Sequence, residues 1–359
     1  MPDSHSSDAR RPARGRRVAV SLVKGGLAAA ILAYLFFQLR DDDGFQRLLE
    51  QPKNWGMLAA AQALVLTALA VNYIRWYVLG RALDLDFSIR DAFRLGALGM
   101  LLNQVSPGAL GGDLFKAVFI AREQPGKRTE AVASVLIDRV VGLYAMLLVA
   151  SLGYAIVSQT TEFTGAIRAV SDAVVVCAGV PSGALLSPLG VTAGIALLMT
   201  PWFTGPAVRN QLARLPVVGG TLARLVDAAA AYRQRRVILL AGILIGCTTH
   251  VLFVLAFWCI GQGLPIQSPP LAMLFVITPM SLAAGAIPLT PSGLGVAEAA
   301  CGQLFRSAGY AQSDGVMVGL AYRVMPYVMA AIGGAYYVRA RRQVREALDQ
   351  AEELAESEA

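Results

Sequence analysis

Long apolar runs are the feature that most constrains the fold of this chain. Six of them lie between short polar or charged stretches, at residues 18–39, 55–80, 130–157, 189–203, 237–261 and 315–338. A helix needs about 20 apolar residues to cross the hydrocarbon core of a bilayer. Because lipid offers no hydrogen-bond partners, each run must pair its own backbone groups and therefore form a helix. The sequence predicts an all-α membrane protein with about six transmembrane helices.

The charged residues indicate how such a protein is oriented. Only 15% of the residues are charged, against about 25% in a typical soluble domain. Arginines cluster beside the apolar runs, at residues 10–17, 122–128, 209–236 and 339–345. Basic clusters of this kind mark the cytoplasmic side of a membrane. The net charge of +7 therefore reflects orientation, not nucleic-acid binding, and we expect a multi-pass protein of the cytoplasmic (inner) membrane with both termini cytoplasmic.

The chain divides into three parts on this basis. Residues 1–17 form a basic cytoplasmic N-terminus, 18–338 a polytopic transmembrane domain, and 339–359 a cytoplasmic C-terminal tail. The first apolar run is interpreted as a retained span, because it has no clear signal-cleavage site. Residues 166–188 are either an interfacial helix or part of a further membrane segment.

Two moderately apolar segments are interrupted in the middle. Residues 88–122 contain Pro107 and several glycines, and residues 267–306 contain Pro279, Pro288 and Pro291. Proline removes a backbone donor and glycine weakens a helix, so a straight span is unfavourable. Two half-helices that meet at the break would satisfy the sequence. Each segment is therefore predicted to be a re-entrant helical hairpin, which is tolerated at membrane depth where it lines a cavity or is surrounded by protein.

The two broken segments resemble each other. One reads Pro107-Gly-Ala-Leu-Gly111 and the other Pro291-Ser-Gly-Leu-Gly295. Arg139 follows the first proline at the same distance as Arg323 follows the second. The basic clusters give the two units, at about 55–157 and 237–338, opposite orientations. The sequence thus predicts an inverted repeat, in which many secondary transporters build a substrate site from facing broken helices.

Charged and polar residues beside the breaks are the candidate site. Ionisable groups at membrane depth are costly unless paired, and they commonly mark function. We expect Asp113 to pair with Arg139, and Glu298 with Arg323. Such pairs are either structural locks or phosphate sites, in which arginine offers two hydrogen bonds to the anion. The candidate substrate-binding residues are Asn103, Gln104, Pro107, Gly111, Gly112, Asp113, Lys116, Asp138, Arg139, Pro291, Gly293, Gly295, Glu298 and Arg323.

Other chemistry has no support in the sequence. The four cysteines lack metal-ligand spacing, and no base lies near a candidate nucleophile. Nucleotide-binding loops and clusters of metal-binding acids are also absent. His250 stands alone in an apolar run and is interpreted as a hydrogen-bonded packing residue. We therefore predict no catalytic residue, no metal and no cofactor, and expect a protein that is not an enzyme.

Three motifs together are similar to a known family. They are Asn103-Gln-Val-Ser-Pro-Gly-Ala-Leu-Gly-Gly-Asp113, Asp138-Arg-Val-Val-Gly142 and Pro291-Ser-Gly-Leu-Gly-Val-Ala-Glu298. They resemble the transmembrane domain of lysylphosphatidylglycerol synthases, a family of flippase-like membrane proteins, over roughly residues 18–345. In its bifunctional members this domain moves an aminoacylated lipid between leaflets, and a separate soluble domain makes that lipid. Lys116 stands where the resemblance implies arginine.

The resemblance implies a function and leaves one alternative. We expect a flippase that moves an anionic, aminoacylated or glycosylated lipid, including polyprenyl-linked ones, between leaflets of the cytoplasmic membrane. The short tail after the last run leads us to expect no aminoacyl-transfer domain, so a separate lipid-modifying enzyme is the expected protein partner. The alternative is a membrane-embedded or accessory component of a lipid-linked glycosyl or aminoacyl transferase system.

Overall fold

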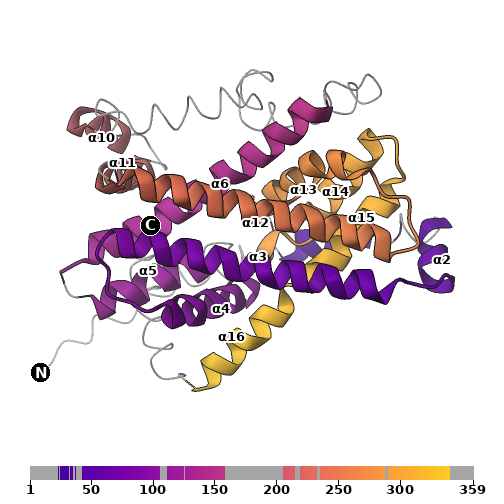
Figure 1. The fold of residues 1–359 in the computed structure, drawn as a ribbon, viewed down its shortest axis with the longest axis horizontal. Helices are drawn as coiled ribbons and strands as arrows, with labels where there is room; N and C mark the ends of the chain where they lie inside the picture. The colour runs from indigo at the N-terminus through magenta and orange to yellow at the C-terminus, as the bar shows by residue number, and fades with distance from the viewer. Residues whose placement is uncertain are drawn as a thin grey trace, which may run out of the picture.

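The protein is helical throughout the part of the chain that the structure describes (Figure 1). This computed structural model describes residues 43–105, 111–124, 126–157, 205–214, 219–232, 235–287 and 290–339, with residues 23, 25–31, 33–34 and 37. The elements are α2 (Asp43–Glu50), α3 (Trp55–Ala82), α4 (Ile89–Val105), α5 (Gly111–Glu123), α6 (Arg128–Val157), α10 (Pro206–Ala213), α11 (Gly219–Tyr232), α12 (Arg236–Gly263), α13 (Leu271–Ala286), the 3-10 turn η2 (Pro291–Gly293), α14 (Val296–Ser307), α15 (Gln312–Val324) and α16 (Tyr327–Arg339).

Four helical stretches in the described residues are long and apolar enough to cross a membrane. They are α3, α6, α12 and the stretch Gln312–Arg339, which contains α15 and α16. These match four of the predicted spans. Residues 25–31 of the first predicted span are helical, but half of that run, the predicted span at 189–203 and the segment at 166–188 lie outside the described residues. The chain is thus an integral membrane protein, and the count of six spans stays a prediction.

The helices α3 and α12 form the central pair and run antiparallel. At one end the backbone N–H of Asn54, which precedes α3, donates to the carbonyl of Gly263 at 2.9 Å. At the other end the hydroxyl of Tyr232, just before α12, donates to the carbonyl of Leu79 at 2.8 Å. The two helices lie side by side along their length in Figure 1. The first span of each predicted unit therefore crosses in the opposite direction to its counterpart.

Both predicted breaks separate a pair of helices. α4 ends at Val105 and α5 begins at Gly111, and the two pack against each other. α13 and α14 pack in the same way on either side of η2. Pro279 does not cause the second break, because it lies inside α13, which continues to Ala286. The helix–break–helix prediction is confirmed for both segments, whereas their re-entrant path in a bilayer stays a prediction.

Equivalent helices of the two units also pack against the other unit in a reciprocal way. α4 of the first unit packs against α16 of the second, and α13 of the second packs against α6 of the first. Glycines allow both approaches. A Cβ at Gly333 of α16 would lie 2.2 Å from the carbonyl oxygen of Ala97, and one at Gly153 of α6 would lie 2.5 Å from Cβ of Phe275.

The last predicted span, residues 315–338, differs from the expectation of one continuous helix. It is divided at Met325 and Pro326 into α15 and α16. Proline has no N–H to donate and its ring crowds the preceding turn, so a helix bends or ends there. The amide of Gln62 on α3 donates to the Met325 carbonyl at 3.1 Å, which supplies a partner at this break.

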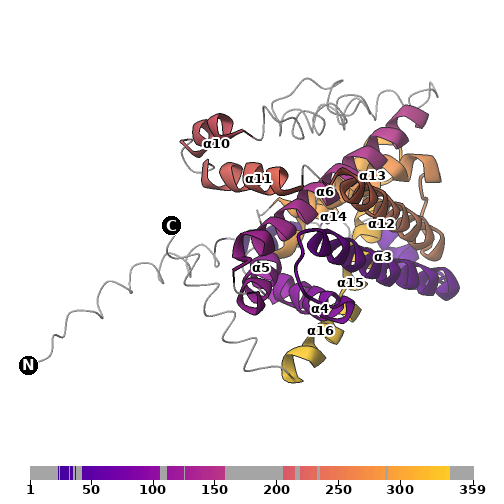
Figure 2. The ribbon, with the colours of Figure 1, turned by 60° about the vertical axis from the view of Figure 1, so that its left-hand side comes forward.

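The shorter helices α10 and α11 lie to one side of the bundle, where α11 packs against α6 and α10 packs against α11 (Figure 2). α11 turns Ala223, Val226 and Ala229 into the interior. Arg209 on α10 pairs with Asp227 on α11 at 2.7 Å, and both side chains are largely exposed. This basic hairpin therefore forms part of the surface of the molecule.

Candidate functional site

One arginine, Arg323, binds several groups of the second break. Arg323 on α15 donates from Nε to Oε1 of Glu298 at 2.6 Å, and from Nη2 to Oε2 at 3.2 Å. The same guanidinium donates to the carbonyls of Ser292 at 2.7 Å and Gly293 at 3.0 Å. Its side chain is only 16% exposed, and that of Glu298 only 1%. The predicted Glu298–Arg323 pair is confirmed, and most donors of this arginine are already used by the break itself.

Ser292 adopts a backbone conformation that is unusual for its residue type. Its φ of 51° and ψ of 24° lie in the left-handed region, where a residue with a side chain is strained by roughly 1–3 kcal/mol. The carbonyl of this residue is held by Arg323. Its hydroxyl donates to the backbone carbonyl of Asn103, on α4 of the other unit. One of the two contacts that hold this strained residue therefore also joins the two breaks.

The first break carries a cluster of three charges. Asp113, in the first turn of α5, accepts a hydrogen bond from Nε of Arg139 on α6. Its other oxygen lies 3.5 Å from Nζ of Lys116, one turn further along α5. The Lys116 ammonium also lies over the ring of Trp76, 5.3 Å from its centroid. The predicted Asp113–Arg139 pair is confirmed, but here one carboxylate faces two cations.

Arg139 differs from Arg323 in how much of it is accessible. Its side chain is 48% exposed, against 16% for Arg323. Among the described residues, the hydrogen bonds of its guanidinium are made by Nε alone, to Asp113. The Nη edge of Arg139 thus has donors available that the second break uses internally.

Asn103 connects the two breaks. Its side-chain oxygen accepts the N–H of Gly112 at 2.9 Å, and its backbone carbonyl accepts the hydroxyl of Ser292. Gly112 adjoins Asp113, and Ser292 is held by Arg323. A continuous path of hydrogen bonds and adjacent residues therefore runs from one ion pair to the other through a single inter-unit contact.

Helix N-termini at the breaks are already partly satisfied. The N–H of Gly112 is taken by Asn103, and the N–H of Gly295 is taken by Oε2 of Glu298 at 2.8 Å. Free donors of this kind attract anions. Since these two are occupied, the side chains of the charged cluster are the stronger anion-binding groups.

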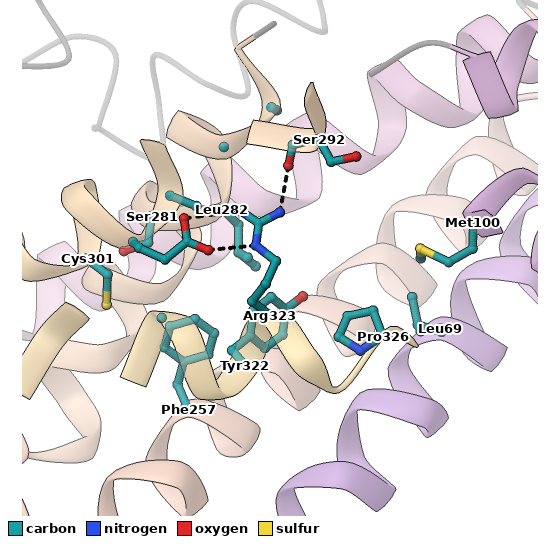
Figure 3. A pocket seen from close by; sticks show the side chains of 15 residues that line it. Leu69, Met100, Phe257, Ser281, Leu282, Ser292, Cys301, Tyr322, Arg323 and Pro326 are labelled. Carbon is teal, nitrogen blue, oxygen red and sulfur yellow. Dashed lines mark hydrogen bonds and ion pairs between the residues drawn. The ribbon is translucent and has the colours of Figure 1, made fainter. Parts of the chain in front are cut away.

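A cavity of about 240 Å³ lies beside the second break (Figure 3). In Figure 3 Arg323 reaches toward Ser292, while Met100 and Leu69 face it from the other side of the cavity. Its lining also includes Glu298, and the remaining lining residues are mainly apolar. The cavity therefore joins an ion pair to an apolar wall supplied by both units.

Asp138 belongs to a different place from the other predicted site residues. Its Oδ1 accepts a hydrogen bond from Nε of Arg75 on α3 at 2.8 Å, and Arg75 is only 4% exposed. Glycines make room for this guanidinium: a Cβ at Gly142 would lie 2.9 Å from its Nη2, and one at Gly246 would lie 3.3 Å from its Nη1. His250 contributes to the same junction, with Nε2 3.1 Å from the Gly142 carbonyl. The hydrogen bond predicted for His250 is confirmed.

Sequence reasoning missed two residues of this arrangement. Arg75 is not among the candidate residues that the sequence indicates, although it lies seven residues before the end of α3 and is buried. Ser292 is not among them either, although the sequence holds a signal for it, because the first motif has Gly108 at the matching position. Glycine is the residue type that favours a left-handed backbone.

Three predicted residues are described only in part or not at all. Pro107 lies outside the described residues, and for Gln104 and Pro291 only the backbone is described, in α4 and η2 respectively. Gly111 begins α5, as expected for a helix that restarts after the break.

Together, the apolar spans and the buried charges beside two helix breaks define a polytopic helical membrane protein. The family model "Lysylphosphatidylglycerol synthase TM region" matches residues 18–334, which is most of the chain. The chain therefore belongs to this family, and it is a membrane protein with a lipid-related function. The search of curated proteins found no match.

Proposed function

We propose that this protein is a flippase that moves the head group of an anionic, aminoacylated or glycosylated lipid between the leaflets of the cytoplasmic membrane. The acyl chains would stay in the bilayer while the head group passes between the two helix breaks. Family membership supports the lipid as the class of ligand. A separate enzyme would supply a modified lipid, and the protein itself would act as a transporter.

The contact between the two breaks is the observation that carries this proposal. Ser292 and Asn103 join the breaks, and an ion pair lies on each side of that contact. A polar passage inside a membrane needs such groups, because a phosphate or amine cannot leave water without new partners. The cavity beside Arg323 supplies space next to this contact, because Ser292 also lines it.

The arrangement of the helices supports an inverted repeat. The antiparallel pairing of α3 and α12 is the relation expected between equivalent spans of oppositely oriented units. The reciprocal packing of α4 on α16 and of α13 on α6 is expected from the same symmetry. Alternating access in such transporters arises when one unit moves against the other around a site at their interface.

The two arginines would have different roles. Arg139, with its accessible Nη edge, would hold the lipid phosphate by two parallel hydrogen bonds. Arg323 would hold the second break in shape through Ser292, Gly293 and Glu298. Asp113 would hold Arg139 in place between transits.

Exchange of each arginine for lysine tests these roles, because lysine keeps the charge and loses the planar fork. In vesicles that contain only the purified protein, we expect Arg139→Lys to insert and fold but to move a fluorescent phospholipid at least about tenfold more slowly, roughly 1.4 kcal/mol. Arg323→Lys should lower thermal stability as well as transfer. Arg128→Lys, at an exposed position at the start of α6, is the matched control.

Two results would contradict the proposal. Transfer by Arg139→Lys at the wild-type rate would remove the phosphate role of Arg139. No transfer by the wild-type protein alone, with transfer restored by adding a lipid-modifying enzyme, would favour the accessory role in a transferase system.

A further inference from the structure

The two breaks are not electrically equivalent. In the second unit Glu298 faces one cation, Arg323. In the first unit Asp113 faces two, Arg139 and Lys116. The residue three positions after Glu298, at the place that Lys116 takes after Asp113, is Cys301, which is fully buried. Lys116 is therefore what gives the first break a positive charge that the second break lacks.

The surplus charge is held in place by the surrounding structure. The side chain of Lys116 is 12% exposed and that of Asp113 is 11% exposed. The ring of Trp76 lies under the ammonium, and such a ring stabilises a cation by its negative face. Asp138, which precedes Arg139 on α6, is already paired with Arg75. Asp113, Lys116 and Arg139 together carry one net positive charge.

A net charge in a poorly solvated place favours a ligand of equal and opposite charge. Here the accessible part of the cluster is the Nη edge of Arg139. Lys116 and Arg139 face different oxygens of the Asp113 carboxylate. We propose that Lys116 is a positioning residue that neutralises Asp113, so that Arg139 binds a lipid head group carrying one phosphodiester charge in preference to a diphosphate or an uncharged sugar.

This inference rests on the proposed function for its ligand, but binding tests it separately from transport. The probes are phosphatidylglycerol with one phosphodiester, a polyprenyl diphosphate with a higher charge, and an uncharged glucosyl diacylglycerol. Purified full-length protein in detergent is titrated with each lipid, and affinity is measured by native mass spectrometry. The wild-type protein should prefer phosphatidylglycerol to both other lipids by about tenfold or more.

Four variants test the charge of the cluster: two change it and two keep it at one positive charge. Lys116→Met keeps the apolar stem over Trp76 and leaves the cluster neutral, so phosphatidylglycerol affinity should fall about tenfold. Lys116→Arg should keep wild-type affinity. Asp113→Asn raises the net charge by one and should shift the preference toward the diphosphate. Lys116→Met combined with Asp113→Asn restores a single positive charge and should restore phosphatidylglycerol binding.

The double variant separates an electrostatic role from a structural one, because two disruptive changes to packing would not repair each other. The control is Lys127→Met. Lys127 lies between α5 and α6 and donates to the Asp84 carbonyl, so this variant should bind phosphatidylglycerol as the wild type does. Equal losses in Lys116→Met and Lys127→Met, or no recovery in the double variant, would overturn the proposal. The recovery is judged on folded protein from gel filtration, so that a poorly folded single variant does not hide it.

Two further measurements show whether the site binds lipid or free phosphate, and whether binding and transport depend on each other. If millimolar inorganic phosphate displaces phosphatidylglycerol from the protein, the site takes free anions from water and the lipid assignment is overturned. If phosphatidylglycerol binds with the predicted charge dependence but is not moved in vesicles, the charge selectivity stands and the flippase function fails. If lipid is moved but Lys116→Met binds phosphatidylglycerol as the wild type does, the flippase function stands and the charge selectivity fails.

Discussion

Arg75 and Asp138 each allow the other to lie inside a candidate membrane span. Their ion pair joins α3 to α6, and both side chains are almost fully buried. Buried pairs of this kind contribute little compared with two apolar residues, but removal of one partner leaves an isolated charge in a poorly solvated place. The pair is therefore a condition for close packing of α3, α6 and α12 around Gly142 and Gly246.

Removal of one partner should cost far more than removal of both. Arg75→Met should lower the free energy of unfolding by about 3–5 kcal/mol, measured by sodium dodecyl sulfate titration in mixed micelles. Combination with Asp138→Leu should recover most of that loss. Arg209→Met breaks an exposed pair and should leave the free energy of unfolding nearly unchanged. Equal losses in Arg75→Met and Arg209→Met would contradict the buried role of Arg75.

At this scale the sequence predicted the ion pairs beside the two breaks but not the pair between Arg75 and Asp138. Asp113–Arg139 and Glu298–Arg323 follow from repeated spacing, because two similar motifs each place an acid and an arginine at nearly the same separation. Arg75 has no repeated counterpart in the motifs. Which face of α3 meets α6 is decided by helix packing, which the nearly uniform apolar pattern of these spans does not encode.

Elements in this protein approach each other where glycine removes a side chain. α16 packs against α4 at Gly333, where a Cβ would lie 2.2 Å from the carbonyl oxygen of Ala97. The neighbouring Gly334 has no atom within 4 Å of such a Cβ. The two adjacent glycines of α16 therefore differ in packing while sharing the same helix and sequence context.

This pair gives a matched test of the contact between the two units. Gly333→Ala should lower the free energy of unfolding by about 1–3 kcal/mol, because the extra methyl group forces α16 away from α4. Gly334→Ala should be neutral or stabilising by up to about 1 kcal/mol, since alanine favours a helix. Thermal unfolding followed by tryptophan fluorescence measures both. Similar effects of the two substitutions would show that α16 does not pack on α4 through Gly333.

The prolines show why element boundaries were only partly predictable. Pro279 and Pro326 both lie in apolar runs, yet Pro279 stays inside α13 and Pro326 ends α15. Beside Pro279, Gly153 of α6 lets α13 lie close to that helix at Phe275. At Pro326, Gln62 of α3 satisfies the Met325 carbonyl. The outcome depends on neighbours far away in the chain, which local sequence patterns do not show.

At the scale of the whole molecule, several loops among the described residues fall into two groups at opposite ends of the α3–α12 pair. At one end Lys127 and Arg235 both contact Asp84, at 2.6 Å and 2.9 Å. At the other end Asn54 bonds to Gly263, and Asp314 accepts the N–H of Gln267 at 3.0 Å. Since α3 and α12 connect the two groups, the groups should face opposite sides of a membrane.

The arginine clusters predict that the first of these ends faces the cytoplasm, and labelling tests the whole arrangement. In a variant whose native cysteines are replaced by alanine, single cysteines are introduced at Arg128 and Ala311, which are both exposed. An impermeant maleimide should label Ala311→Cys in intact spheroplasts and Arg128→Cys only in inside-out vesicles. Ser313→Cys is the accessibility control, because Ser313 is 4% exposed at the start of α15 and should react slowly from either side. Labelling of Arg128→Cys from outside would reverse the orientation. Labelling of both exposed positions from the same side would mean that the chain crosses the membrane an even number of times between them. The two units would then have the same orientation, which would contradict the proposed passage.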